Sequence, residues 1–331
     1  MLEFTPYNLN DRLFFIIIAL VLNAILGALP WLKQNTGLRG MALFLRRFLL
    51  HLEQKLNRHT RTEEDRIIRG AVVLVVILLI TCSIACLFSH TTALHPWTWV
   101  LEASILALFI PQRQIYERGS YILQCLREKD IHRARKSARI YSLRDTHNLD
   151  DHAIARTTIE YIASALSDRV LSAIFWYVIL GLPGFVASKI ITEAGWIMGY
   201  ASSRYRSYGR AASAGETVIN WVPARLASIM IAIASLFIPN GRPVAALYGM
   251  FREVHSIHLP QKGSAVAAAA RAMRVSLGGP RSVQGYLIQD KWVGTGSAKV
   301  SLLDLRKFLL LYAIACLLNI VLIASLLIVR A

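Results

Sequence analysis

Long apolar runs, separated by charged segments, constrain this chain more than any other feature of its sequence. Four of them approach or reach the roughly 20 residues that a helix needs to cross a membrane, and they cover residues 13–32, 67–88, 97–111 and 308–329. Inside lipid every backbone N–H and C=O must be satisfied by the protein, so such runs form helices. The sequence therefore predicts an all-α, polytopic helical membrane protein with additional amphipathic and cytoplasmic helices.

Two more apolar stretches, 170–191 and 222–239, raise the predicted number of transmembrane helices from four to as many as six. The first stretch contains GLPG at 181–184. A Gly-Pro break in a membrane helix is tolerated only where protein or a water-filled cavity satisfies the freed backbone groups. Two arrangements stay open: both stretches span and the basic loop 194–220 lies outside, or a re-entrant segment keeps that loop inside.

The formal charge of +17 has two interpretations. Nucleic-acid binding needs a basic face on a soluble domain with base-reading groups, whereas Lys and Arg in a membrane protein mark the cytoplasmic loops. The second fits better, because residues 33–69 hold nine Lys/Arg against four acids, residues 240–307 hold ten against three, and residues 89–96 hold none. We therefore expect 33–69 and 240–307 in the cytoplasm, the 89–96 link and both termini outside, contact with membrane lipid, and no nucleic-acid partner.

The chain 1–331 is predicted to form a single membrane-embedded domain, with a central polar region at 113–226 and a basic cytoplasmic loop at 240–307. Residues 40–56 place apolar side chains at helical spacing beside basic ones, which is typical of an amphipathic helix in the headgroup region. The four cysteines include no C-x-x-C pair and are expected to be small packing residues.

One predicted helix of the central region carries polar residues four positions apart, on a single face: Arg156, Glu160, Ser164 and Asp168. A solvated stripe with an Arg156–Glu160 pair worth a few tenths of a kcal/mol is one interpretation. A face that carries chemistry is the other. The glycines of LGGP at 277–280 and GTG at 294–296 leave a similar choice between a phosphate contact and an ordinary turn.

Charged residues in apolar runs are functional candidates, because placing them in lipid costs a few kcal/mol. Glu102 lies near the outer end of 97–111, where snorkelling to water is the simpler explanation. Arg225 lies just inside 222–239 and needs an anionic partner or ligand. Asn220 is predicted to cap that helix.

Short blocks follow one another along the chain: RDTHNLD (144–150), Glu160, Asp168, AIFWYVILGLPG (173–184), Lys189, Gly199, RYRSYGRAA (204–212), NWVPARL (220–226) and LGGP. In order and spacing they resemble the CobD/CbiB family, the adenosylcobinamide-phosphate synthases of cobalamin assembly, over most of the chain. The resemblance implies a multi-pass protein of the bacterial inner membrane. It also implies a ligase that uses ATP to join an aminopropanol, or its phosphate, to a propionate of the corrinoid adenosylcobyric acid.

The resemblance further implies which residues act. Carboxylate activation places negative charge on a phosphoryl group, which Mg²⁺ and cationic side chains stabilise. The retained family positions assign catalysis to Arg144, Asp145, Glu160 and Asp168, with Mg²⁺ bound by the three carboxylates among them. Substrate binding is assigned to Lys189, Asn220 and Arg225, and we expect Glu160, Asp168, Lys189 and Arg225 to converge within one ligand's width.

Some polar positions of the family pattern are missing. EYIASALSDR stands in place of roughly ESLAENLSDG, TEAGWIMGY in place of NTLDSMIGH, and LPQKGSAV in place of SPNAGWPM. The losses fall on groups able to bind ligands, while the apolar frame is kept. A second function therefore stays open: a catalytically degenerate member that acts with a protein partner, as a membrane scaffold or as a signalling protein like the AmpE proteins, which resemble the same family.

Overall fold

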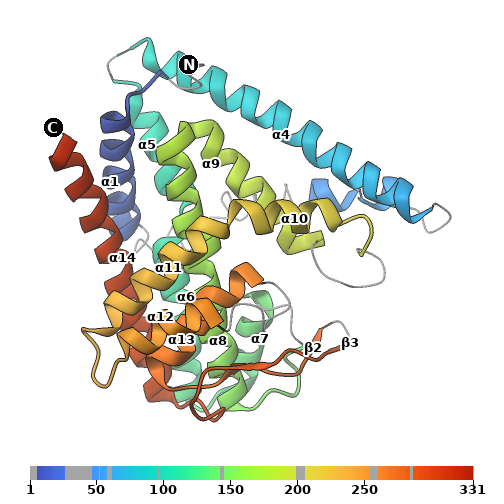
Figure 1. The fold of residues 1–331 in the computed structure, drawn as a ribbon, viewed down its shortest axis with the longest axis vertical. Helices are drawn as coiled ribbons and strands as arrows, with labels where there is room; N and C mark the ends of the chain where they lie inside the picture. The colour runs from blue at the N-terminus through green and yellow to red at the C-terminus, as the bar shows by residue number, and fades with distance from the viewer. Residues whose placement is uncertain are drawn as a thin grey trace. The chain divides into compact units, whose positions relative to one another are not determined.

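The computed structural model describes residues 6–26, 47–51, 53–57, 62–95, 97–141, 145–198, 206–252, 260–283 and 286–330. Most of them are helical (Figure 1). The described residues also include four short strands. The chain divides into two compact units. Unit 1 comprises 1–111, 172–220 and 323–331, and unit 2 comprises 112–171 and 221–322.

Among the described residues, three helical stretches are long and apolar enough to cross a membrane: α4 (Glu63–Ala93), the continuous stretch Asp151–Met198, and α14 (Leu302–Arg330). The bent pair of α10 (Arg210–Ile219) and α11 (Trp221–Ser235) would make a fourth. The predicted helical membrane class is confirmed. The region predicted as a third span contains α5 (Trp99–Phe109), whose 11 residues extend only about 16 Å.

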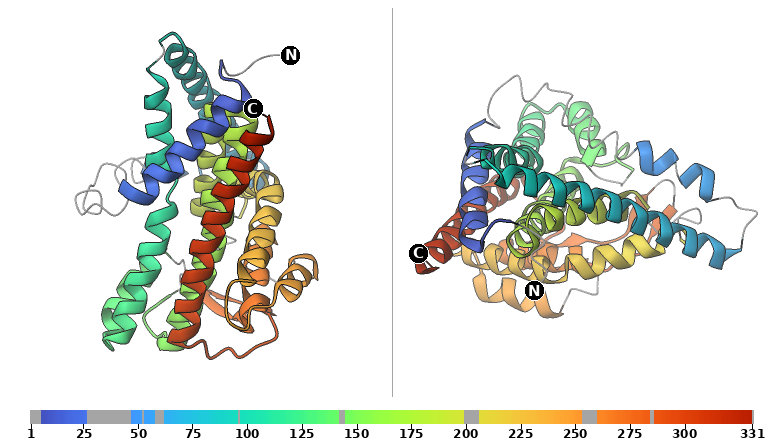
Figure 2. Two further views of the ribbon diagram at one scale, coloured as in Figure 1. Left: turned by 90° about the vertical axis from the view of Figure 1, so that its left-hand side faces the viewer. Right: turned by 90° about the horizontal axis from the view of Figure 1, so that it is seen from above.

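In unit 1, α1 (Leu9–Leu26) packs against α5, and α4 packs against both α9 (Ser172–Met198) and α10 (Figure 2). The sequence sets the start of α4, because the Thr62 hydroxyl accepts a hydrogen bond from the Asp65 N–H at 3.3 Å. The segment predicted as an amphipathic helix is helical at 47–51 and 53–56. Its Leu49 is buried among α4, α9 and α10, so this face of the segment packs on protein.

The predicted break in the central apolar stretch lies inside α9. Gly181 has φ 64° and ψ −152°, a conformation that essentially only glycine adopts. Pro183 has no N–H, so the Ile179 carbonyl loses its helical partner. The Arg12 guanidinium donates to that carbonyl at 2.9 Å and to the Val178 carbonyl at 3.2 Å. As expected for a broken membrane helix, a protein group satisfies the freed backbone.

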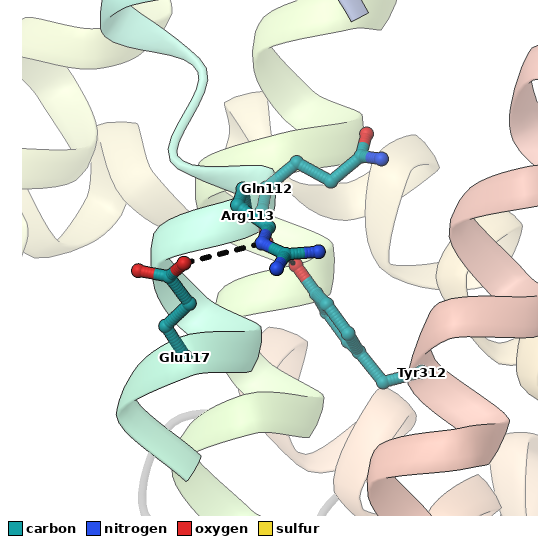
Figure 3. Close-up of polar contacts among 4 residues, drawn as sticks. All are labelled: Gln112, Arg113, Glu117 and Tyr312. Carbon is teal, nitrogen blue, oxygen red and sulfur yellow. Dashed lines mark hydrogen bonds and ion pairs between the residues drawn. The ribbon is translucent and has the colours of Figure 1, made fainter. Parts of the chain in front are cut away.

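Unit 2 contains α6 (Gln112–Arg127), α7 (Ile131–Tyr141), α8 (Asp151–Ala165), a π-helix η1 (Leu166–Leu171), α11, α12 (Pro243–Arg252) and α13 (Pro260–Met273). The helices α11, α12 and α13 pack against one another. The start of α6 is tied to α14, because the buried Tyr312 hydroxyl donates to the Gln112 carbonyl at 2.9 Å (Figure 3). The next residue, Arg113, forms an ion pair at 3.2 Å with Glu117 one turn along α6 (Figure 3).

The strands of unit 2 form two antiparallel pairs. β1 (Leu277–Gly278) pairs with β4 (Trp292–Val293), and β2 (Arg281–Val283) pairs with β3 (Tyr286–Ile288). Gly278, Gly279 and Gly294 have φ values of 78°, 74° and 98°, which glycine adopts without strain. Gly278 belongs to β1, and residues 294–296 form a bend after β4. The strands themselves were not predicted, because two or three residues are too few to show a period of two.

Candidate functional site

The polar face of α8 contacts the strands of unit 2. The Glu160 carboxylate accepts a hydrogen bond from the Gly278 N–H at 2.8 Å. Arg156 donates to the Ala298 carbonyl at 2.8 Å, and its guanidinium carbon lies 5.1 Å from the centre of the Trp292 ring. The solvated-stripe interpretation is therefore wrong for Arg156 and Glu160, which both hold the β segment onto the helix.

Asp145 joins the same region from the loop before α8. Its N–H donates to the Ser282 carbonyl at 2.9 Å, and the Ser282 hydroxyl donates to its carboxylate. The segment 277–283 thus contacts two of the predicted catalytic carboxylates. We call this group the α8–β1 site, and it consists of Asp145, Arg156, Glu160, Gly278, Ser282 and Trp292.

The segment 277–283 is also held in place by contacts with residues 290–292. Arg281 and Asp290 form an ion pair at 2.6 Å, and both side chains are largely buried. A Cβ on Gly279 would lie 2.6 Å from the Trp292 ring, so only glycine permits this close approach. The backbone that meets Asp145 and Glu160 is therefore rigidly positioned by the fold of unit 2.

Asp168 lies in η1, two helical turns after Glu160, and its side chain is buried. Eight residues of helix separate the two by about 12 Å along the axis. Single π turns inside α-helices are frequent at functional sites. η1 packs against α11, which carries Arg225.

Arg225 contacts its own helix. Its guanidinium donates to the Trp221 carbonyl at 2.8 Å and lies 3.8 Å from the centre of the Trp221 ring. The contact is a cation–π interaction within one turn of α11. The predicted anionic ligand of Arg225 stays a prediction.

Two predicted substrate-binding residues lie in unit 1. The Lys189 ammonium is 5.7 Å from the centre of the Phe185 ring. Asn220 ends α10 and is fully buried, and its amide nitrogen donates to the Thr192 hydroxyl on α9 at a long 3.5 Å. The Asn220 side chain therefore reaches α9 instead of capping α11. Lys189 and Asn220 belong to unit 1, whereas the other described candidates, Asp145, Glu160, Asp168 and Arg225, belong to unit 2. The convergence of Lys189 with Glu160, Asp168 and Arg225 therefore stays a prediction. Arg144 lies outside the described residues.

Two buried carboxylates of unit 1 were missed or misjudged. Glu216, one turn before Asn220, is fully buried, and a Cβ at Gly195 would lie 2.3 Å from its Oε2. The spacing of Glu216 and Asn220, one turn apart just before the apolar stretch 222–239, was the available signal. Glu102 is 1% exposed and accepts hydrogen bonds from the Tyr177 hydroxyl at 2.8 Å and the Ser89 hydroxyl at 3.1 Å. The snorkelling interpretation of Glu102 is wrong.

A family model described as "CobD/Cbib protein" matches residues 16–312, and thereby includes the α8–β1 site, Lys189, Asn220 and Arg225. The chain belongs to the CobD/CbiB family. It is 28% identical over 312 residues to "Cobalamin biosynthesis protein CobD" of Rhizobium meliloti (strain 1021), which covers 92% of this chain and 94% of the relative. The protein of the same description from Brucella suis biovar 1 (strain 1330) is 30% identical over 249 residues, covering 74% and 76%. No solved structure matches the chain.

The α8–β1 site of this CobD/CbiB family member offers carboxylates for a nucleotide-bound magnesium ion but no free glycine N–H groups for its phosphates. No three His, Cys, Asp or Glu side chains of the described ranges lie close enough to bind a metal alone. Mg²⁺ that arrives with phosphates needs only one or two protein carboxylates. Asp145 and Glu160 are oxygen ligands of the kind it takes, and they contact Ser282 and Gly278 of one short segment. The N–H groups of Gly278 and Gly279 already donate to Glu160 and to the Lys291 carbonyl, so this glycine pair does not fit a phosphate.

Proposed function

We propose that this CobD/CbiB family member is a membrane-bound ligase of cobalamin assembly, an adenosylcobinamide-phosphate synthase. It forms an amide bond between adenosylcobyric acid and aminopropanol or its phosphate, with ATP and Mg²⁺, in a bacterial inner membrane. The observation that carries the proposal is the family match over residues 16–312, a range in which Glu160 bonds to Gly278 and Asp145 to Ser282 of one short segment. The relatives' descriptions as cobalamin biosynthesis proteins support the pathway.

Each retained residue has a role in the proposal. Asp145 and Glu160 hold the Mg²⁺, which supplies positive charge to the phosphates of ATP. Asp168, buried in the π turn, acts beside α11 as an acid or base group. Arg144, Lys189, Asn220 and Arg225 bind the anionic and polar groups of the substrates, where a guanidinium grips a propionate or phosphate with two parallel hydrogen bonds.

The test is growth of a strain that lacks its own adenosylcobinamide-phosphate synthase on medium that requires corrinoid assembly. We expect this protein to restore growth and its Glu160→Gln variant to fail. Glutamine keeps an oxygen to accept the hydrogen bond of the Gly278 N–H, so the variant removes charge while preserving that contact. Asp151→Asn is the matched control, because it removes one charge from an exposed position of the same helix and should restore growth.

A second candidate function is a non-catalytic membrane scaffold. It is favoured by the hydrogen bonds of Asp145 and Glu160 to the β segment, which give both carboxylates a structural reason to be present. On this alternative the unmodified protein, present and folded in the membrane, does not restore growth. Restored growth by both the parent and Glu160→Gln would instead leave the ligase intact and remove Glu160 from its site.

A further inference from the structure

Helix α12 of unit 2 presents a face of large apolar side chains to its surroundings. Val244, Leu247, Tyr248 and Phe251 are 79%, 37%, 44% and 71% exposed. Their spacing of i, i+3, i+4 and i+7 places them on one side of the helix. Soluble surfaces rarely gather such residues, and a contiguous exposed apolar patch marks an interaction site.

The opposite side of α12 is fixed against the protein. Ala246, Gly249 and Met250 are buried, and α12 packs against α13. A Cβ on Gly249 would lie 2.8 Å from the Ala267 carbonyl, so the two backbones approach closely. The exposed face is therefore set by the packing of unit 2, and the helix cannot turn it inward without losing that contact.

A second group of exposed apolar side chains lies on the helix that packs against α12. At the end of α11, which packs against α12, Ile233, Leu236 and Phe237 are 38%, 63% and 62% exposed. Six aliphatic or phenyl side chains and Tyr248 thus lie exposed within residues 233–251. α11 is itself apolar enough to form part of a membrane span. The exposed apolar side chains therefore run from the end of this possible span to the end of α12, at Phe251.

The charged residues of α11, α12 and the link between them are all basic, and Glu253 follows directly after Arg252. Residues 221–252 contain Arg225, Arg242 and Arg252 and no acid. Arg242 directly precedes α12 and Arg252 is its last residue, and both side chains are exposed. The ring of Tyr248 lies 5.2 Å from the Arg252 guanidinium and 4.7 Å from that of Arg271. An apolar face with a basic rim and an interfacial aromatic ring complements an anionic lipid surface.

We propose that α12, together with the end of α11, lies in the membrane interface. Its apolar face is inserted among the acyl chains, and Arg242 and Arg252 contact the phosphates of anionic lipids. The sequence placed all of 240–307 in the cytoplasm; on this proposal the loop begins at the membrane surface, which holds unit 2 against the bilayer. The inference does not depend on the proposed ligase activity.

Depth-dependent fluorescence quenching of the full-length protein in nanodiscs tests the proposal. The four cysteines are replaced by alanine, and single cysteines are introduced as Leu247→Cys, Phe251→Cys or the control Thr295→Cys, each labelled with an environment-sensitive fluorophore. Thr295 is also exposed in unit 2 but lies in the β segment. With spin-labelled phosphatidylglycerol in the disc, we expect quenching at 247 and 251 to exceed that at 295 at least twofold.

Equal quenching at the three positions would overturn the proposal. Protection of 247 and 251 from a water-soluble quencher without quenching by lipid would also overturn it, because that outcome indicates a protein partner or a second copy. A photo-reactive residue at position 251 of the chain with its native cysteines serves if the cysteine-free protein fails to fold. Lipid adducts at 251 and none at 295 would support the interface, and adducts to protein alone would refute it.

Discussion

Gly195 of α9 has no side chain, and this leaves room for the Glu216 carboxylate where α9 packs against α10. A Cβ there would lie 2.3 Å from Oε2, 2.7 Å from Cδ and 2.8 Å from Cβ of Glu216. A new rotamer of Glu216 would relieve the first two contacts and not the third. The fit of this helix pair therefore depends on glycine at position 195.

We expect Gly195→Ala to destabilise the protein by about 1–3 kcal/mol, the usual cost of overpacking. The measurement is the thermal midpoint of the detergent-solubilised protein. Gly215→Ala is the control on the partner helix, since its nearest neighbour is a flexible Ile191 methyl at 3.3 Å. Alanine is also favoured over glycine within a helix by about 0.5–1 kcal/mol. Equal loss in both variants would refute the role of Gly195.

The tyrosine before α10 is predicted to make stability depend on alkaline pH. Burial, together with the nearby Glu53 carboxylate, raises the pKa of Tyr208 to about 12. In the unfolded chain a tyrosine ionises near pH 10, so between pH 10 and 12 the folded state binds more protons. Its contribution is complete below pH 10 and is lost as the pH rises to 12.

The Tyr208→Phe variant has no proton to lose at this position. We expect its thermal midpoint to fall less than that of the parent between pH 9.5 and 11.5, by a few degrees. The other tyrosines titrate in both proteins and cancel in the comparison. Identical declines would show that Tyr208 does not titrate differently in the folded protein.

At the scale of elements, the break in α9 is completed by a residue from α1. Arg12 supplies the hydrogen bonds that Pro183 and the Gly181 conformation take from the Ile179 and Val178 carbonyls. Leaving a backbone acceptor unsatisfied costs about 1–3 kcal/mol. We therefore expect Arg12→Gln to lower stability by that amount, measured by thermal unfolding in detergent, with Arg12→Lys losing less.

Arg133→Gln is the matched control for Arg12→Gln. The Arg133 side chain is 67% exposed and pairs with Asp130, and such surface pairs contribute about 0–1 kcal/mol. Gly181→Ala tests the break from the other side, because its backbone conformation is strained for any L side chain. A stable Gly181→Ala variant would mean that α9 is not broken there.

The sequence predicts features that depend on neighbouring residues and misses contacts between residues far apart in the chain. Hydropathy locates the long helices, and GLPG locates the break, because both signals are local. The partners are distant: Arg12 lies 167 residues from Ile179, Tyr177 lies 75 from Glu102, and Gly278 lies 118 from Glu160. Sequence patterns therefore identified Glu160 as a candidate and could not show that it anchors a strand.

At the scale of the whole molecule, charge asymmetry predicts which side of the membrane each loop occupies. The 240–307 loop, rich in Lys and Arg, is expected in the cytoplasm, and the 89–96 link without them outside. Leu94 and Lys299 are both exposed and report on the two sides. In a protein whose native cysteines are replaced, Leu94→Cys should react with a membrane-impermeant maleimide in intact cells. Lys299→Cys should react only after permeabilisation.

The Lys299 result also bears on the proposed function. Lys299 follows Ala298, whose carbonyl accepts the hydrogen bond of Arg156 in the α8–β1 site. ATP is available on the cytoplasmic side, so a ligase needs this site there. Labelling of Lys299→Cys in intact cells, with Leu94→Cys protected, would invert the topology and remove the site from its nucleotide. That outcome would contradict both the charge-based orientation and the ligase, and it would leave the scaffold function as the one that fits.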